Sequence, residues 1–236
     1  MPAAKASPAP RSRTEMVHQA LRKAIIEQRL APGSRLPEDA IGESFGTSRT
    51  IAREALGRLA VEGLVDLKPN RGAFVANPTL DEARGIFSVR RALERAMMLE
   101  LSGKIDAATA TRLRRMVAEE TALASTNEAE AIRLAGEFHL TLAQLTGNPL
   151  LLRYVTETVS RCSLVLAMYG RPHSADCGAR EHAAIVEALI AGRADEAADL
   201  MDSHVAEVAS RALLTARVDQ DIRDVLADYA RDMLRA

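Results

Sequence analysis

The chain has 236 residues, which is enough for one large domain or two ordinary ones with a buried core. Hydrophobic residues make up 47% and charged residues 27%, which is the balance of a soluble globular protein. Aromatic residues are only 3%, and alanine and leucine, both strong helix formers, dominate the apolar set. We therefore expect a mainly α-helical protein.

The sequence carries no signal for export or membrane insertion. Residues 1–12 are rich in Pro, Ala and Ser without the apolar core of a signal peptide, so we expect a disordered tail. No apolar run reaches the roughly 18 residues that a membrane span needs. Cys162 and Cys177 have no metal-like or redox-like spacing, which predicts free thiols. These features predict a cytoplasmic protein with no membrane partner.

The net charge of −1 conceals an asymmetry along the chain. Residues 1–78 hold 12 Lys and Arg against 8 Asp and Glu, so they carry +4 and the remainder carries −5. Charge differences of this size are common on solvated surfaces, so the asymmetry alone is weak evidence. Its sign nevertheless fits a DNA-binding module joined to a second domain.

The first part of the chain predicts a winged helix-turn-helix over residues 13–76. Helical spacing of apolar residues, with Pro and Gly at the breaks, indicates helices at about 14–28, 37–45 and 48–62. Two short apolar runs, 64–67 and 73–75, flank a Pro/Asn/Gly turn and predict a β-hairpin wing. Residues 77–79 contain a proline and form the expected linker.

The remainder, residues 80–236, contains no run with the alternation of a strand. Breaks at Gly and Ser clusters separate helical segments near 80–103, 106–125, 128–146, 149–169, 178–191, 194–216 and 218–235. Helices of this number and length predict a six- or seven-helix bundle.

The third helix has two faces that suit DNA reading. On a helical wheel its apolar residues share one side, while Arg49, Thr50 and Arg53 occupy the other. Arginines four residues apart can contact guanine edges or phosphates in the major groove. Ser48, the expected N-cap, also offers a hydroxyl near the positive end of the helix dipole.

Two further cations lie near the expected DNA surface. Arg71 and Gly72 form the tip of the predicted wing, which suits a narrow groove, and Arg35 precedes the second helix, where it can touch a phosphate. Any one of these arginines is more simply a solvated surface residue. The ordered set favours DNA contact.

The first part of the chain carries a series of family motifs, which are Ala31-Pro32-Gly33-Ser34-Arg35-Leu36, Thr47-Ser48-Arg49-Thr50, Arg53-Glu54-Ala55-Leu56 with Leu59, Glu62-Gly63-Leu64-Val65 and Arg71-Gly72-Ala73-Phe74-Val75. With these motifs, residues 14–76 resemble the DNA-binding domain of the GntR family of bacterial regulators. The resemblance implies that Arg49, Thr50 and Arg53 face DNA and that Gly72 lies near the minor groove. Asp39 stands where some relatives carry a basic DNA contact, so no contact is transferred there.

Three of the five histidines lie on different predicted helices of the second part. His139, His182 and His204 have a residue type that binds divalent metals, and a helix bundle is a common place for ligands to converge. Spacing alone favours a different interpretation, in which three separate helix histidines are surface or packing residues.

The second part carries its own landmarks, which are Arg90 with Leu93 and Glu94, Phe138-His139 through Gly147-Asn148, Glu181-His182, and Met201 with His204. Residues 80–216 thereby resemble the helical FCD effector domain of the FadR-type branch of the GntR family. The resemblance implies that the three histidines bind a divalent metal (Zn, Ni or Mn) and an effector. The family's aspartate ligand is replaced by Ala135, so water or an effector carboxylate would complete the site, or the histidines bind an anion directly.

Arg90 resembles the family arginine that meets the carboxylate of an effector, and a guanidinium matches a carboxylate in a bidentate fork. The alternative is a surface pair between Arg90 and Glu94, four residues apart. The resemblance thus implies a small organic acid as the ligand class.

Taken together, these inferences predict a homodimeric transcription regulator and not an enzyme. It would bind a near-palindromic double-stranded operator, sense a small organic acid and act as a repressor. Two rival hypotheses remain: a metalloenzyme using the three histidines with Glu137 or Glu181 as base, and an architectural DNA-binding protein without a ligand.

Overall fold

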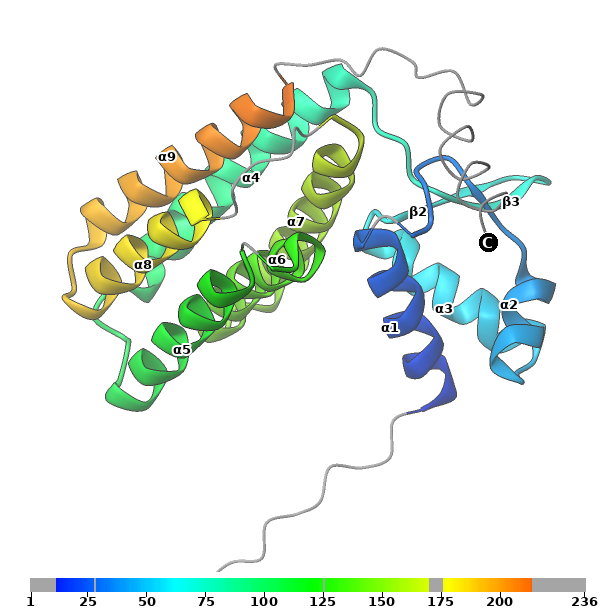
Figure 1. Ribbon diagram of the computed structural model, residues 1–236, viewed down its shortest axis with the longest axis horizontal. Coiled ribbons are helices and arrows are strands. Elements are labelled where there is room, and N and C mark those ends of the chain that lie inside the picture. The colour runs from blue at the N-terminus through cyan, green and yellow to red at the C-terminus, as the bar shows by residue number, and fades with distance from the viewer. Residues whose placement is uncertain (1–11, 28, 125, 170–175, 214–236) are drawn as a thin grey trace, which may run out of the picture.

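The computed structural model describes residues 12–27, 29–124, 126–169 and 176–213, which form two packed parts (Figure 1). The N-terminal part consists of α1 (Arg13–Ile26), β1 (Arg35–Leu36), α2 (Glu38–Phe45), α3 (Arg49–Val61), β2 (Val65–Lys68) and β3 (Gly72–Val75). The C-terminal part consists of α4 (Leu80–Leu101), α5 (Ala107–Leu123), α6 (Glu128–Leu145), α7 (Pro149–Tyr169), α8 (Asp176–Ile190) and α9 (Ala194–Leu213). The mainly helical class is confirmed.

The N-terminal part is a winged helix. Strands β2 and β3 form the predicted hairpin, with Lys68 opposite Gly72, and β1 joins on the far edge of β3, with Arg35 opposite Phe74. Asn70 and Gly72 adopt positive φ values of 58° and 93°, which the tight turn between the strands requires. Strand β1 was not predicted, because two residues are too few to show any periodicity.

The three helices of this part close over a small apolar core. Leu56 and Leu59 of α3 are fully buried against Val17 and Ile25 of α1. Ser48 caps α3 through its side chain, which accepts a hydrogen bond from the backbone N–H of Ile51. These features confirm the predicted helix-turn-helix.

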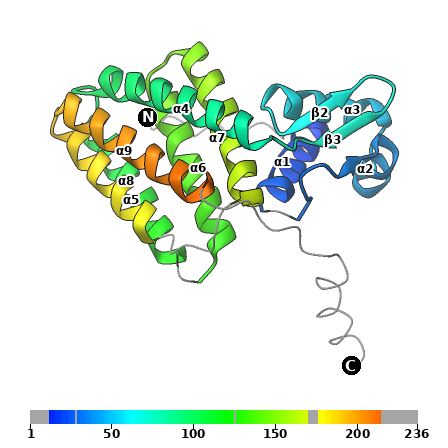
Figure 2. The ribbon, with the colours of Figure 1, turned by 90° about the horizontal axis from the view of Figure 1, so that it is seen from above.

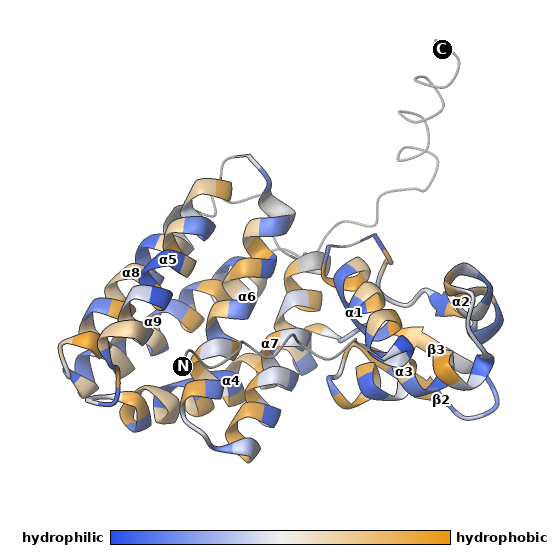
Figure 3. Cartoon of the chain, turned by 90° about the horizontal axis from the view of Figure 1, so that it is seen from below, coloured by the Kyte–Doolittle hydropathy of each residue, from blue (hydrophilic) through white to orange (hydrophobic). Residues whose placement is uncertain are grey.

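The C-terminal part is a bundle of six described helices, each with a hydrophobic and a hydrophilic side (Figure 3). Helix α4 packs along α9 and against α7, and α5 packs against α6 and α8 (Figure 2). Its core includes Phe138, Met97 and Leu113. Asn148 accepts hydrogen bonds from the backbone N–H groups of Leu150 and Leu151, so it caps α7.

Several sequence-based expectations fall partly or wholly outside the described residues. These are the tail at residues 1–12, of which only the last is described, and the last helix, near 218–235. Cys162 is a buried free thiol, whereas the side chain of Cys177 is not described. Within the described ranges no helix is both long and apolar enough to cross a bilayer.

One side chain of the C-terminal part belongs to the N-terminal core. Leu164 of α7 is 1% exposed and packs into the apolar cluster of the winged helix. Removal of its branched end leaves a cavity that the rigid neighbours fill only in part. The two parts are therefore joined by apolar packing as well as by the linker.

We expect Leu164→Ala to lower the free energy of unfolding by about 2–4 kcal/mol, because a buried leucine is truncated. Val61→Ala, at a side chain of α3 that is 62% exposed, is the control and should change the free energy of unfolding little. Urea unfolding followed by circular dichroism measures both. Equal losses for the two variants would contradict the packing role of Leu164.

Candidate DNA-binding surface and metal centre

The exposed face of α3 carries the arginines that the sequence singled out. Arg49 and Arg53 each expose 72% of their side chains, while Ala52 and Leu56 on the opposite face are buried. Thr50 is exposed beside them. The predicted separation of the helix into an apolar and a cationic face is thus confirmed, and DNA contact by these residues remains a prediction.

The wing and β1 present the remaining predicted cations. Arg71 and Gly72 are exposed at the turn between β2 and β3, and Arg35 is exposed on β1. Among the described residues neither arginine has an ion-pair partner. Both guanidinium groups are therefore free to contact an anionic partner.

Two acidic residues of α2 pair with the arginines of α3, and the sequence did not predict these contacts. Glu38 accepts two hydrogen bonds from Arg53, one from Nε at 2.8 Å and one from Nη2 at 2.6 Å. Asp39 forms an ion pair with Arg49. Both arginines on the exposed face of α3 are thus paired with carboxylates of α2, and this pairing depends on how the two helices cross.

In the C-terminal part, three helices bring the three predicted histidines together. His139 comes from α6, His182 from α8 and His204 from α9, and all three are buried. One ring nitrogen of each lies within 4.8 Å of those of the other two, and Nε2 of His182 is 3.2 Å from Nε2 of His204. The interpretation as separate surface or packing residues does not fit this cluster.

Each histidine uses its other nitrogen to bind a carboxylate. Nδ1 of His139 is 2.5 Å from Glu94, Nδ1 of His182 is 2.8 Å from Glu120, and Nδ1 of His204 is 2.6 Å from Glu181. An ionised carboxylate only accepts hydrogen bonds, so Nδ1 is the protonated nitrogen and Nε2 carries the lone pair. The chain position of Glu120 gives no hint of this role, because α5 is brought to the site only by the bundle.

The donor set fits a divalent cation. With both Nδ1 atoms protonated, the Nε2 atoms of His182 and His204 present two lone pairs to each other with no hydrogen between them. A cation removes this repulsion, and Nε2 atoms about 2.0–2.1 Å from a tetrahedral Zn²⁺ lie about 3.3 Å apart, close to the observed separation. The three histidines are thus suited to hold a metal ion, and their carboxylate partners to orient them.

Arg90 lies beside this site and is buried with Glu94, so the alternative of a surface pair is wrong. Its Nε donates to Glu94 at 2.6 Å, and both side chains are at most 5% exposed. Burial alone raises the pKa of Glu94, but the positive charge of Arg90 and the contact with His139 lower it to about 2. Arg90 already has an internal carboxylate, and contact with an effector remains a prediction.

Burial also sets the protonation of the neighbouring groups. It lowers the pKa of His139 to about 4, and the charge of Arg90 adds to this effect against the opposing pull of Glu94. The pKa of His204 is lowered by burial and then by the other two histidines. Both imidazoles are therefore neutral at pH 7, the form that binds metal.

Among the described residues, no fourth His, Cys, Asp or Glu joins the three histidines as a ligand. Ala135 lies one turn before His139 on α6 and has no donor atom. Glu137 is directed to Arg22 of α1, at 3.1 Å, rather than to the histidines. The carboxylates of Glu94, Glu120 and Glu181 are each bound to an Nδ1 atom. A metal held here would keep positions open for an external ligand.

Comparison with known proteins finds a family match for the winged helix and another for the helical bundle. The model of bacterial regulatory proteins of the gntR family matches residues 13–75, and the FCD domain model matches residues 85–207. The chain belongs to the GntR family of bacterial regulatory proteins. It is a transcription regulator with an FCD domain, a combination that implies DNA binding and a small-molecule effector.

Individual relatives of this GntR regulator are also transcription regulators. It is 30% identical to the HTH-type regulator YdhC of Bacillus subtilis over 71% of this chain and 76% of that protein. It is 32% identical to the HTH-type transcriptional repressor RspR of Escherichia coli, but only over 35% of this chain and 36% of that protein. A structure titled a putative GntR transcriptional regulator from Rhodococcus covers 88% of this chain and all of that chain, with a TM-score of 0.71 and 26% identity.

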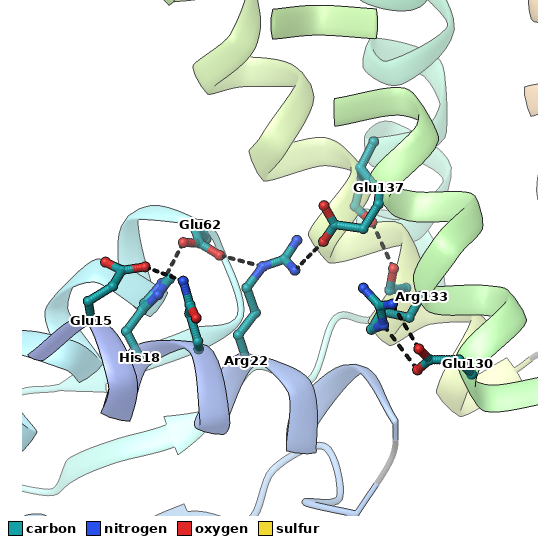
Figure 4. Close-up of polar contacts among 10 residues, drawn as sticks. Glu15, His18, Arg22, Glu62, Glu130, Arg133 and Glu137 are labelled. Atoms are coloured by element: carbon teal, nitrogen blue, oxygen red, sulfur yellow. Dashed lines mark hydrogen bonds and ion pairs between the residues drawn. The ribbon is translucent and has the colours of Figure 1, made fainter. Parts of the chain in front are cut away.

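The two parts of this GntR regulator meet at a polar junction next to the histidine site. Arg22 of α1 lies between two carboxylates (Figure 4). Its Nε donates to Glu62 at 3.1 Å and its Nη1 donates to Glu137 at 3.1 Å. Glu62 is the C-cap of α3, whereas Glu137 precedes His139 by two residues on α6. One guanidinium thus connects the end of α3 to α6, the helix that carries His139.

Steric contact reinforces the junction. Gly63 follows α3 with a φ of +72°, and a Cβ at this position would collide with the side chain of Arg161 on α7. Only glycine satisfies both the left-handed conformation and the close approach. Sequence reasoning assigned Gly63 to the helix end, and the tertiary contact was not foreseeable.

We expect Glu120→Gln to weaken binding of Zn²⁺ or Ni²⁺ by about 10–100-fold, because it replaces the charged partner that orients His182. Glu119→Gln, an exposed residue on the same helix, is the matched control and should leave the affinity unchanged. Competition with a chromogenic chelator measures both affinities. Equal affinities of the two variants would exclude the orienting role of Glu120.

Proposed function

We propose that this protein is a homodimeric, acid-responsive repressor in which a metal ion held by the three histidines receives the carboxylate of the effector. The observation that carries the proposal is the convergence of His139, His182 and His204, with the nearby carboxylates all committed to Nδ1 atoms. A cationic site with open positions selects an anionic ligand that can coordinate it. A small organic acid has this chemistry.

The residues around the ion would act as supports. Glu94 holds His139, while Arg90 supplies a positive charge that offsets the carboxylate. An incoming carboxylate would bind the ion and could share the N–H groups of Arg90 that Glu94 does not use. Zinc, nickel and manganese all accept imidazole, so the donor set does not select one of them.

DNA binding would use α3 in the major groove, with the wing at the adjacent minor groove. Arg49, Thr50 and Arg53 would read bases or phosphates, Ser48 and Arg35 would contact the backbone, and Arg71 with Gly72 would enter the narrow groove.

Large apolar side chains remain exposed on α4 and α7, which pack together in the bundle: Val89, Leu99, Leu150 and Tyr154. A second copy covering them would give the two-fold symmetry that matches a near-palindromic operator in the cytoplasm.

The junction at Arg22 provides a route from ligand to DNA. A ligand that shifts His139 also shifts Glu137 on the same helix, and Arg22 connects Glu137 to Glu62 at the end of α3. The ligand changes DNA affinity only as far as it prefers one arrangement of this junction over another. Release of DNA on ligand binding would make the protein a repressor, as its relative RspR is named.

The proposal is tested on the full chain with an operator selected from a random duplex library. Zn²⁺ with a panel of two- to six-carbon hydroxy and dicarboxylic acids should include one that lowers operator affinity by about 5–150-fold in fluorescence anisotropy. His182→Gln should abolish this response and keep DNA binding. Arg49→Ala should keep metal binding and lose the operator. A response that survives in His182→Gln would remove the histidines from sensing.

We expect Glu137→Gln to reduce the effect of ligand on operator affinity at least threefold, because it removes the charge that Arg22 binds across the junction. Glu130→Gln is the matched control on the same helix, since Glu130 pairs only with its neighbour Arg133 among the ion pairs of the described residues. The same anisotropy titrations, with and without ligand, give the ratio. An unchanged ratio in Glu137→Gln would exclude this ion pair from the coupling.

A further inference from the structure

The two arginines expected to read DNA are not free cations. Arg53 is bound in a fork by Glu38, and Arg49 is paired with Asp39. All four side chains remain accessible, the least exposed being Glu38 at 31%. The cationic face of α3 is therefore electrically balanced, with two positive and two negative charges on one exposed patch.

The arginines elsewhere in this domain differ in their partners. Arg58, also on α3, pairs with Glu15 and Glu54 at the opposite end of the helix. Arg35 and Arg71 have no ion-pair partner within the part of the chain that the structure describes. Arg49 and Arg53 at the N-terminal end of α3 therefore have acidic partners from α2, whereas Arg35 and Arg71 have none among the described residues.

Carboxylate and phosphate compete for the same guanidinium donors, because both accept a bidentate pair of hydrogen bonds. To bind a phosphate of arbitrary DNA with its full fork, Arg53 must leave Glu38, which then remains as an unpaired negative charge close to the backbone. Nη1, which Glu38 does not engage, can still donate to either group, but the negative charge of Glu38 repels a phosphate and not a neutral base edge. Pairing therefore penalises indiscriminate phosphate contact more than base reading.

Arg49 and Arg53 can also exchange their acidic partners for another anion. They are solvent-exposed, so water and salt screen them and they are weak compared with buried ion pairs. The hydrogen bond from Arg53 holds the pKa of Glu38 below its ordinary value, so this carboxylate is charged at neutral pH. The acids thus stay negative on the surface that approaches DNA.

We propose that Glu38 and Asp39 are specificity-determining residues that hold Arg53 and Arg49 for base reading and suppress their binding to non-cognate phosphates. The inference rests on the proposed DNA-reading role of α3. It assigns to Asp39, an acid on the DNA side, a function that its charge alone would seem to oppose. A simpler alternative is that both acids only stabilise the N-terminus of α2 through the helix dipole.

The test uses the full-length chain, the selected operator and a scrambled duplex of equal length and composition. Asp39→Asn and Glu38→Gln should each raise affinity for the scrambled duplex about tenfold while changing operator affinity less, so that discrimination falls about tenfold. Each freed arginine adds a phosphate contact, so the slope of log affinity against log salt for scrambled DNA should steepen by about 0.9.

Glu43→Gln is the matched control, because it removes one negative charge from the same helix at an exposed residue that has no ion pair among those of the described chain. It should raise affinity for both duplexes by the same small factor. Glu38→Asp should restore part of the discrimination by keeping the charge near Arg53. Thermal unfolding of each variant checks the helix-dipole alternative.

A lower melting temperature with unchanged discrimination would overturn the inference in favour of a purely structural role. Equal changes of discrimination in Asp39→Asn, Glu38→Gln and Glu43→Gln would show that only the net charge matters. That result would overturn the inference as well. If the wild-type chain enriches no sequence, the DNA-reading role itself fails. If it enriches one and the variants discriminate as well as wild type, only the present inference fails.

Discussion

Three imidazole rings in a buried site require three carboxylates to fix the position of their protons. Without an acceptor on Nδ1, each neutral ring could carry its proton on either nitrogen, and the Nε2 atoms would not present a common set of lone pairs. Glu94, Glu120 and Glu181 remove that freedom. They come from α4, α5 and α8, so the site exists only when these helices are packed around α6 and α9.

The need for a carboxylate beside each histidine explains why charged side chains are buried in the core of the bundle. A buried carboxylate such as Glu94 is costly unless it is paired, and Arg90, one turn earlier on α4, supplies the charge and a hydrogen bond. The resulting chain of contacts runs from Arg90 through Glu94 to His139. Removing any member leaves a buried polar group without its partner, so the network is expected to be rigid.

Charge pairing also organises the exposed face of α3 in the winged helix. Arg49 and Arg53 are paired with acids, but in solvent, where pairs exchange easily. Buried pairs fix the histidine site, whereas exposed pairs leave Arg49 and Arg53 available to another partner. Arg22 is intermediate between these two cases: its side chain is 17% exposed at the junction, where it binds one carboxylate from each part. Its position makes it the natural place for the two parts to influence each other.

Local pattern determined the elements of this protein. Apolar periodicity and Pro/Gly breaks located the helices and the hairpin to within a few residues, because amphipathic spacing and turn chemistry act over a few neighbouring positions. Motifs in the sequence also identified the family, and with it Arg49, Arg53, His139, His182 and His204. Only the tertiary structure could show Glu120 on His182, Asp39 on Arg49, and Arg22 between Glu62 and Glu137. These partners are far apart in the chain or on crossing helices, and the geometry of packing, which no local pattern encodes, decides which charges meet.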